Sequence, residues 1–211
     1  MGIILNLLAD MARGFYRKRE VAYLRGKITS RHEAWIGELL NDIGWKIKDT
    51  SPSFSAIRQS YCRSVGYGDL DIGANGQRAF CSEAPIIFSV YLGGFPAFML
   101  GGEFRGDVFC IRQLQGALGV AIPPELKHWP RLLVEACMES AEQYGIPEIR
   151  LYRAHQTLFY RMPVFEGPPQ AISAYRQRMR RRYDGTARQL GFTMKRDWGE
   201  WKNPAYERPS V

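Results

Sequence analysis

The sequence predicts an α+β protein with a mixed, mostly antiparallel central sheet flanked by helices. Three observations predict it: helical periodicity in the N-terminal part, short aromatic or β-branched segments broken by glycines over 69–115, and a strand–helix alternation after 107. Short breaks force antiparallel neighbours, whereas strands joined by a helix are parallel. We expect one structural unit, with a helical part over 1–68 packed on a sheet domain over 69–204.

Two helices are expected at the N-terminal end. Residues 3–24 place apolar side chains at helical spacing ahead of a basic run, Arg17 to Arg19. This helix would pack on its own domain or lie on an anionic membrane surface. Ser30 with Glu33 resembles a capping box for a second helix, whose apolar stripe ends at Gly44. The segment 50–68 is expected to be a loop with a short helix.

A β-meander is expected over 69–115. Asn75-Gly76 is typical of a type I′ hairpin turn, and strands follow at 85–94, 95–104 and 107–115. The periodicity then predicts a helix that ends at Gly145, with Pro130 in its first turn and 124–129 as a lead-in turn.

The C-terminal part is expected to hold two strands around a helix. Residues 148–154 form the first strand, which would run parallel to 107–115. After a proline-rich loop at 161–169, a helical stretch covers 170–191, with Gly185 as a candidate break. Residues 192–201 form the closing strand, and the remainder is a tail.

The composition favours a reduced, metal-free protein with anionic partners. The net charge of +8 predisposes the chain toward nucleic acid, anionic lipid or a phosphorylated cofactor, although a basic surface alone would also explain it. Cys62, Cys81, Cys110 and Cys137 are far apart, which favours free thiols in a cytoplasmic protein and leaves peripheral attachment to the inner membrane open. The three histidines form no zinc motif, and no apolar stretch is long enough to span a bilayer.

Residues 107–200 resemble a known bacterial family. The segments "RQLQGALG", "RLYRAHQ" and "RRYDGTARQLGF" are similar to the VirK/YbjX family, which is itself GNAT-like. The resemblance implies a GNAT-like sheet over 69–204, and links to bacterial envelope integrity and virulence. It also implies that strands 107–115 and 148–154 part at one end to hold an acyl group.

The resemblance also implies site residues. Backbone N–H groups of the glycine turn would bind the pyrophosphate of acyl-CoA, and the turn comprises Gln115, Gly116, Ala117, Leu118 and Gly119. The other interpretation is a turn whose glycines supply positive φ. Two features depart from the family: Pro123 and Pro124 separate the turn from its helix, and Ala187 stands where many GNAT enzymes place a tyrosine acid.

The catalytic candidates are His155 as general base, Glu103 as a carboxylate that deprotonates an amine, and Tyr183 as acid. Tyr183 could serve only if its helix is shifted. Structural alternatives stay open for each: a strand-end cap, a solvated turn residue, and pairing of Tyr183 and Asp184 with nearby arginines.

Two functions follow as hypotheses. The first is an acyltransferase that uses acyl-CoA or acyl-carrier protein to acylate an unknown amine or hydroxyl acceptor. The second is a non-catalytic GNAT-like protein whose cleft or basic helix binds a protein, anionic lipid or nucleic acid. The basic helix carries Arg176, Arg178, Arg180, Arg181 and Arg182. Nucleic acid is disfavoured because few aromatic rings accompany them.

Overall fold

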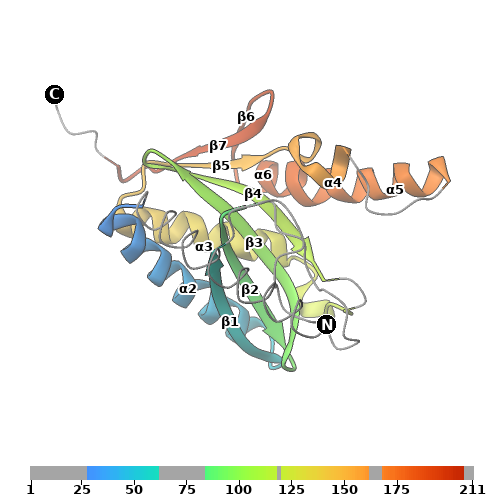
Figure 1. Ribbon diagram of the computed structural model, residues 1–211, viewed down its shortest axis with the longest axis horizontal. Coiled ribbons are helices and arrows are strands. Elements are labelled where there is room, and N and C mark those ends of the chain that lie inside the picture. Colours follow the sequence, from blue (N-terminus) through green and yellow to red (C-terminus); the bar gives the residue numbers. More distant parts are fainter. Residues whose placement is uncertain (1–27, 62–83, 118–119, 162–167, 207–211) are drawn as a thin grey trace, which may run out of the picture.

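The computed structural model describes residues 28–61, 84–117, 120–161 and 168–206 (Figure 1). It holds a seven-stranded sheet in the order β1-β2-β3-β4-β5-β7-β6. All neighbours are antiparallel except β4 and β5, so the predicted mixed, mostly antiparallel sheet is confirmed. The strands are β1 (Phe54–Tyr61), β2 (Ile86–Leu92), β3 (Phe95–Arg105), β4 (Val108–Gly116), β5 (Glu148–Tyr152), β6 (Thr193–Met194) and β7 (Trp198–Lys202).

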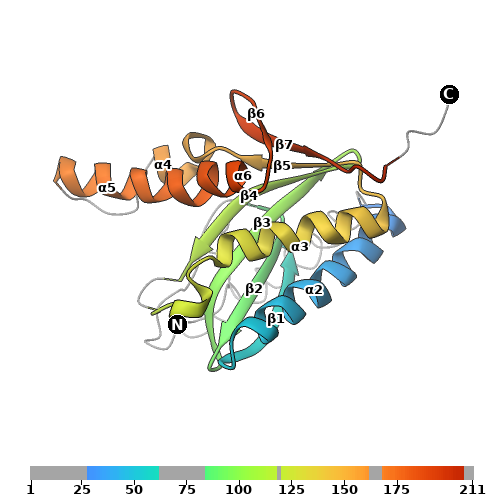
Figure 2. The same cartoon turned by 180° about the vertical axis from the view of Figure 1, so that it is seen from behind.

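Helices α2 and α3 contact each other and lie together against the sheet (Figure 2). The helix that carries the basic run contacts the 3-10 turn that follows β5, and its last turn contacts β6 and α3. The helices are α2 (Ser30–Thr50), α3 (Trp129–Tyr144), α4 (Leu158–Arg161), α5 (Pro169–Arg180) and α6 (Thr186–Gln189), with short 3-10 turns at Pro124–Leu126 and Ala154–Gln156.

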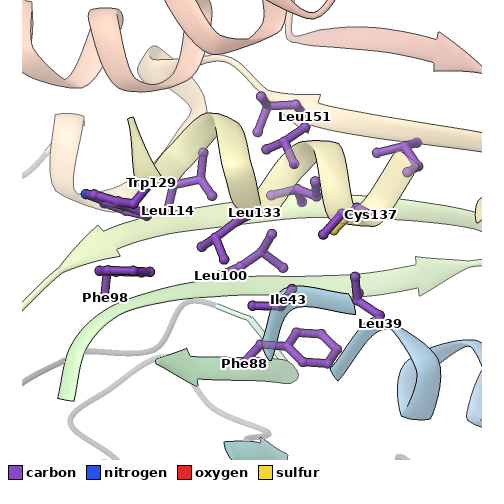
Figure 3. Packing of buried hydrophobic residues seen from close by; sticks show 14 of the residues in the cluster. Leu39, Ile43, Phe88, Phe98, Leu100, Leu114, Trp129, Leu133, Cys137 and Leu151 are labelled. Carbon is purple, nitrogen blue, oxygen red and sulfur yellow. The ribbon is translucent and has the colours of Figure 1, made fainter. Parts of the chain in front are cut away.

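One hydrophobic core joins these helices to the sheet. Leu39 and Ile43 of α2 and Leu133 of α3 are fully buried among strand side chains such as Phe88 and Leu100 (Figure 3). Each large apolar side chain that is buried in this way stabilises the fold by about 1.5–3 kcal/mol before entropy is counted. The core therefore fixes α3 against β4, and with it the first turn of α3.

The limits of α2 differ from the expectation. Thr29, not Ser30, is the N-cap, and His32 in place of Glu33 completes the capping box because its imidazole accepts from the Thr29 N–H. The helix continues through Gly44 to Thr50, since the buried stripe extends to Ile47.

The segment 50–68 does not form the expected loop with a short helix. It contains β1, which pairs with β2 at the edge of the sheet and is only partly buried. The serines and charged residues of this segment do not favour a strand. At the edge of a sheet, strand formation depends more on pairing with the neighbouring strand than on the propensity of the residues. The expected helix 3–24 and the Asn75-Gly76 hairpin lie outside the described residues.

The meander and the central helix are as expected. β2, β3 and β4 follow one another as antiparallel neighbours, Pro130 lies in the first turn of α3, and Gly145 caps α3 in the left-handed region. The lead-in residues form the 3-10 turn Pro124–Leu126. These features depend on local signals, which is why the sequence predicted them.

The C-terminal part departs from the expectation twice. The long helix is not broken at Gly185: α5 runs into a π-helical segment, Arg181–Gly185, and then into α6. The closing stretch 192–201 is a hairpin of β6 and β7 rather than one strand, and the Lys195 N–H donates to the Trp198 carbonyl across its turn at 2.8 Å.

Among the described residues, none of the helices has the length and apolarity that crossing a bilayer requires. Cys110 and Cys137 are buried free thiols, and burial raises the pKa of Cys110 to about 11. Cys62 and Cys81 lie outside the described residues. Over the same described ranges, no group of three metal-ligating side chains is present.

Candidate functional site

The site begins where β4 and β5 part. The two strands pair over four positions, from Val108 with Glu148 to Ile111 with Leu151. Beyond Ile111, β4 continues to Gly116 with β3 as its one neighbour among the described strands, whereas β5 ends at Tyr152. This is the parting that the GNAT resemblance implied.

A β-bulge marks the point of separation. Gly102 pairs with Ile111 and Gly101 with Gln113, so Arg112 is the extra residue of β4. A bulge bends its strand and changes the alternation of its side chains. Ile111 and Leu114, three positions apart, both belong to the same hydrophobic core. The bulge therefore turns β4 away from β5 while keeping its apolar side chains in the core.

Tyr183 occupies the open edge of β4. The Leu114 N–H donates to the Tyr183 hydroxyl oxygen at 2.7 Å, and that oxygen lies 3.3 Å from the Leu114 carbonyl. Arg182 also donates to this carbonyl at 3.3 Å. Side chains thus satisfy the two backbone groups that a longer β5 would have bonded.

Asp184 holds the end of the other strand. One carboxylate oxygen accepts from the Ala154 N–H at 3.1 Å, and the other lies 3.2 Å from an Arg153 guanidinium nitrogen. Asp184 is only 6% exposed, so these partners offset the cost of burying its charge. Consecutive residues of the π-helical segment therefore reach both parted strands: Arg182 and Tyr183 bind β4, and Asp184 binds the residues that follow β5.

Gln115, Gly116 and Ala117 of the predicted phosphate-binding turn lie within the described residues. Gly116 pairs with Phe98 and is not among the glycines with positive φ, so the alternative interpretation, a turn glycine with positive φ, is wrong at this position. The Ala117 N–H donates to the Ala97 carbonyl at 2.7 Å, and the Gln115 side chain accepts from Gln113. Leu118 and Gly119 lie outside the described residues.

A basic pocket lies instead at the first turn of α3. It has a volume of about 410 Å³, and its charged lining comprises Lys127, Arg131, Arg181 and Arg182. Backbone donors are scarce there because the N–H groups of Arg131 and Leu132 bond the His128 carbonyl and Pro130 has none. Cationic side chains, rather than the glycine turn, are the groups that could hold phosphates here.

His155 lies in the 3-10 turn after β5. Its imidazole Nε2 is 3.5 Å from an Asp197 carboxylate oxygen, and its side chain is 39% exposed. It follows Ala154, whose N–H bonds the Asp184 carboxylate, and both His155 and Asp184 line the same cavity. His155 also lines a second basic cavity of about 620 Å³.

Glu103 is placed elsewhere. A Cβ on Gly102 would point into the Phe109 ring of the core, so the next residue, Glu103, points to the opposite face of the sheet. Its carboxylate is 2.7 Å from Arg105 and 3.4 Å from Arg112. Tyr183 belongs to the core cluster on the helix side. The structure therefore places His155 in a cavity with Asp184, Tyr183 at the open edge of β4, and Glu103 on the opposite face of the sheet.

Arg182 belongs to the site, but the sequence did not distinguish it from the neighbouring arginines. Burial lowers its pKa, and its guanidinium carbon lies 5.4 Å from the centre of the Trp129 ring. Within the part of the chain that the structure describes, no carboxylate lies within ion-pair distance of it. The dense run "RRRYDG" was the available signal, but no spacing rule separates this inward arginine from its outward neighbours.

Two solved structures are similar to this chain. One is the ribosomal-protein-S18-alanine N-acetyltransferase from Escherichia coli, with 14% identity and a TM-score of 0.35 over 72% of this chain and 96% of that one. The other is nourseothricin acetyltransferase, with 18% identity and a TM-score of 0.26 over 59% and 82%. Both TM-scores are low, so the fold is defined by this chain's own strand order and by the parting of β4 and β5. No protein-family model matches the sequence, and no curated protein matches it.

Proposed function

We propose that the protein is a GNAT-like acyltransferase that moves an acyl group from acyl-CoA or acyl-carrier protein to an amine or hydroxyl acceptor. One observation carries the proposal: β4 parts from β5 at a bulge, and a tyrosine hydroxyl lies 2.7 Å from a backbone nitrogen that the parting leaves without a partner on β5. A backbone N–H directed at a developing oxyanion is the usual means of stabilising acyl transfer.

The residues of the open edge are suited to this chemistry. A thioester supplies an electrophilic acyl carbon and a thiolate that leaves. Leu114 would donate its N–H to the acyl oxygen in place of Tyr183, and the released Tyr183 hydroxyl would give its proton to the departing sulfur. The acceptor nitrogen or oxygen would attack the acyl carbon while His155, oriented by Asp197, accepts its proton, and the C–S bond would then break. Proton exchange with solvent then returns Tyr183 and His155 to their starting protonation states.

The phosphates of the donor fit the pocket at the first turn of α3. Its lining offers four cationic side chains, and Arg182 joins that pocket to the open edge because it also binds the Leu114 carbonyl. Guanidinium groups donate to phosphate oxygens in forked pairs. We therefore place the phosphates on Lys127, Arg131 and Arg181 rather than on the backbone of the glycine turn.

A thermal-shift titration followed by an acyl-transfer assay tests the proposal. Acetyl-CoA and longer acyl-CoAs should raise the melting temperature by mass action. Tyr183→Phe should retain that shift and lower kcat by about a hundredfold, because it removes the acid and leaves the donor pocket intact. Tyr144→Phe removes a hydroxyl at the other end of α3 and should change neither. If no acyl-CoA or acyl-carrier protein shifts the melting temperature, the proposal fails.

The second candidate, a non-catalytic binding protein, is favoured by a specific observation. Both backbone groups of Leu114 are already satisfied by Arg182 and Tyr183, so the edge is stable without a ligand. In this case acyl-CoA would leave the Leu114 N–H unchanged, and the basic pockets would bind an anionic partner. The acyl-transfer assay separates the two candidates, because only the first predicts transfer of the acyl group.

A further inference from the structure

The second basic cavity lies against the other side of the long helix. It has a volume of about 620 Å³ and lies between the helix and the residues that follow β5. We call it the arginine pocket, and its lining comprises Arg153, Tyr160, Arg180, Arg181, Asp184 and Arg188 together with His155, Gln177 and Gly185. The pocket at α3 instead faces Lys127–Arg131, so only Arg181 and Gly185 line both.

The charges of the arginine pocket are not balanced. Four arginines face one carboxylate, Asp184, which is already bonded by Arg153 and the Ala154 N–H. Over the described ranges, Arg180, Arg181 and Arg188 have no carboxylate within 4.0 Å. Like charges gathered in a concave wall repel one another and concentrate anions from solution. The pocket therefore favours an anionic occupant.

Part of the lining is held in place before any ligand binds. The Arg180 Nε donates to the Tyr160 hydroxyl at 2.9 Å, and the Arg176 Nε donates to the Tyr160 carbonyl at 3.2 Å. Their guanidinium carbons lie 5.6 and 5.5 Å from the centre of the Tyr160 ring. A guanidinium that is fixed through Nε keeps its two terminal nitrogens in a forked arrangement for an oxyanion. A neighbouring hollow of about 690 Å³ continues past Tyr160 and Arg180.

These observations select a phosphate group over other anions. A phosphate monoester presents three terminal oxygens and carries close to two charges, which suits three guanidinium groups that have no carboxylate partner among the described residues. Base stacking is disfavoured because the Tyr160 ring already lies against the guanidinium groups of Arg176 and Arg180. We infer that the arginine pocket binds a phosphate monoester through Arg180, Arg181 and Arg188, with the body of the ligand over Tyr160 and the neighbouring hollow. This inference does not depend on acyl transfer.

Calorimetric titration of the full chain with glycerol 3-phosphate, at constant ionic strength, tests the inference. Arg188→Gln is the leading variant because Arg188 lines the arginine pocket and not the pocket at α3, and among the described residues its side chain has no ion pair. Arg188→Gln and Arg180→Gln should each weaken binding about tenfold or more, since a hydrogen bond to a charged group contributes about 1.5–3 kcal/mol. Arg178→Gln is the matched control: it removes one charge from the same helix outside the pocket and should change affinity less than about twofold.

Two parallel titrations distinguish a free phosphate ester from a lipid headgroup as the source of the phosphate. Soluble glycerol 3-phosphate represents a free ester, and phosphatidic acid in phosphatidylcholine vesicles represents a lipid headgroup; the arm that responds to Arg188→Gln identifies the source. Glycerol and pure phosphatidylcholine vesicles are the matched ligands without a monoester. The inference is overturned if neither arm binds, or if all three arginine variants weaken binding equally. It also fails if Arg188→Gln weakens acetyl-CoA as much as glycerol 3-phosphate, because the pocket would then hold the phosphates of the donor.

Discussion

The two halves of β4 are held in different ways. From Val108 to Ile111 the strand is paired on both sides, with β3 and β5. From the bulge at Arg112 to Gly116, β3 pairs on one side, and side chains from the π-helical segment bond the other. A strand pair can be exchanged only by opening the sheet, whereas a tyrosine hydroxyl can be exchanged for a ligand atom by a side-chain movement. The open half of β4 is therefore the part where a ligand atom could replace a protein hydrogen-bond partner without opening the sheet.

The largest effect should come from overpacking the paired half. Gly102 lies opposite Ile111, and a Cβ added to it would be 2.3 Å from the buried Phe109 ring. Gly102→Ala should therefore lower the free energy of unfolding by about 3 kcal/mol. In the open half, Gly116→Ala places its Cβ 3.9 Å from Trp129 and should cost less than about 1 kcal/mol. Urea denaturation of both variants measures the two free energies of unfolding. Equal decreases in the two variants would contradict the expected difference between the paired and the open half.

A smaller effect is expected from the open half itself. Tyr183→Phe leaves the buried Leu114 N–H without its acceptor and should lower the free energy of unfolding by about 1–3 kcal/mol. Amide hydrogen exchange should accelerate at Leu114 and stay unchanged at Ile111, which β5 still covers. Unchanged protection of Leu114 would show that the hydroxyl does not hold this edge.

Stability at the closed end of β4 should depend on pH through His32, which lies 3.4 Å from Asp107 and stacks on Phe104. Burial lowers the pKa of His32 below 6.5 despite the opposing charge of Asp107. The unfolded chain therefore binds a proton that the folded chain does not, and the free energy of unfolding should fall as pH drops below 6.5. His32→Gln should flatten this dependence in urea titrations at pH 5–8; an unaltered slope would contradict it.

The smallest effect concerns Cys110 in the paired half. Burial raises the pKa of its thiol to about 11, so it should carry almost no thiolate at pH 8. Iodoacetamide should leave Cys110 unmodified in the native protein and modify it in urea, as measured by peptide mass spectrometry. Rapid native modification would show that this half of the strand opens.

The elements that the sequence predicted well are those with local signals. Pro130 and Gly145 bound α3, and glycines at the turns separate β2, β3 and β4. β1 was missed because its pairing with β2 comes from a segment far along the chain. The bulge at Arg112 could not be predicted either, since an extra residue is defined only by the register of β3.

The candidate site could be predicted only in part, because several of its contacts depend on the register of distant segments. Tyr183 and His155 were singled out by the chemistry that the resemblance implied. The structure places Tyr183 against β4 and His155 in a cavity with Asp184, and their catalytic roles stay predictions. The Ala117 N–H, expected to face a phosphate, is used by Ala97 because β4 stays paired with β3 beyond the bulge. The roles of Arg182 and Asp184 follow from the π-helical segment, which no spacing rule in the sequence marks.

The central claim is that the Leu114 amide can exchange Tyr183 for a donor carbonyl. Amide chemical shifts of the labelled full chain, recorded during a titration with acetyl-CoA, test it most directly. The account predicts a saturable change at Leu114, with little change at Ile111 on the paired side of the bulge. Saturation of the protein with acetyl-CoA while the Leu114 resonance stays in place would contradict the account.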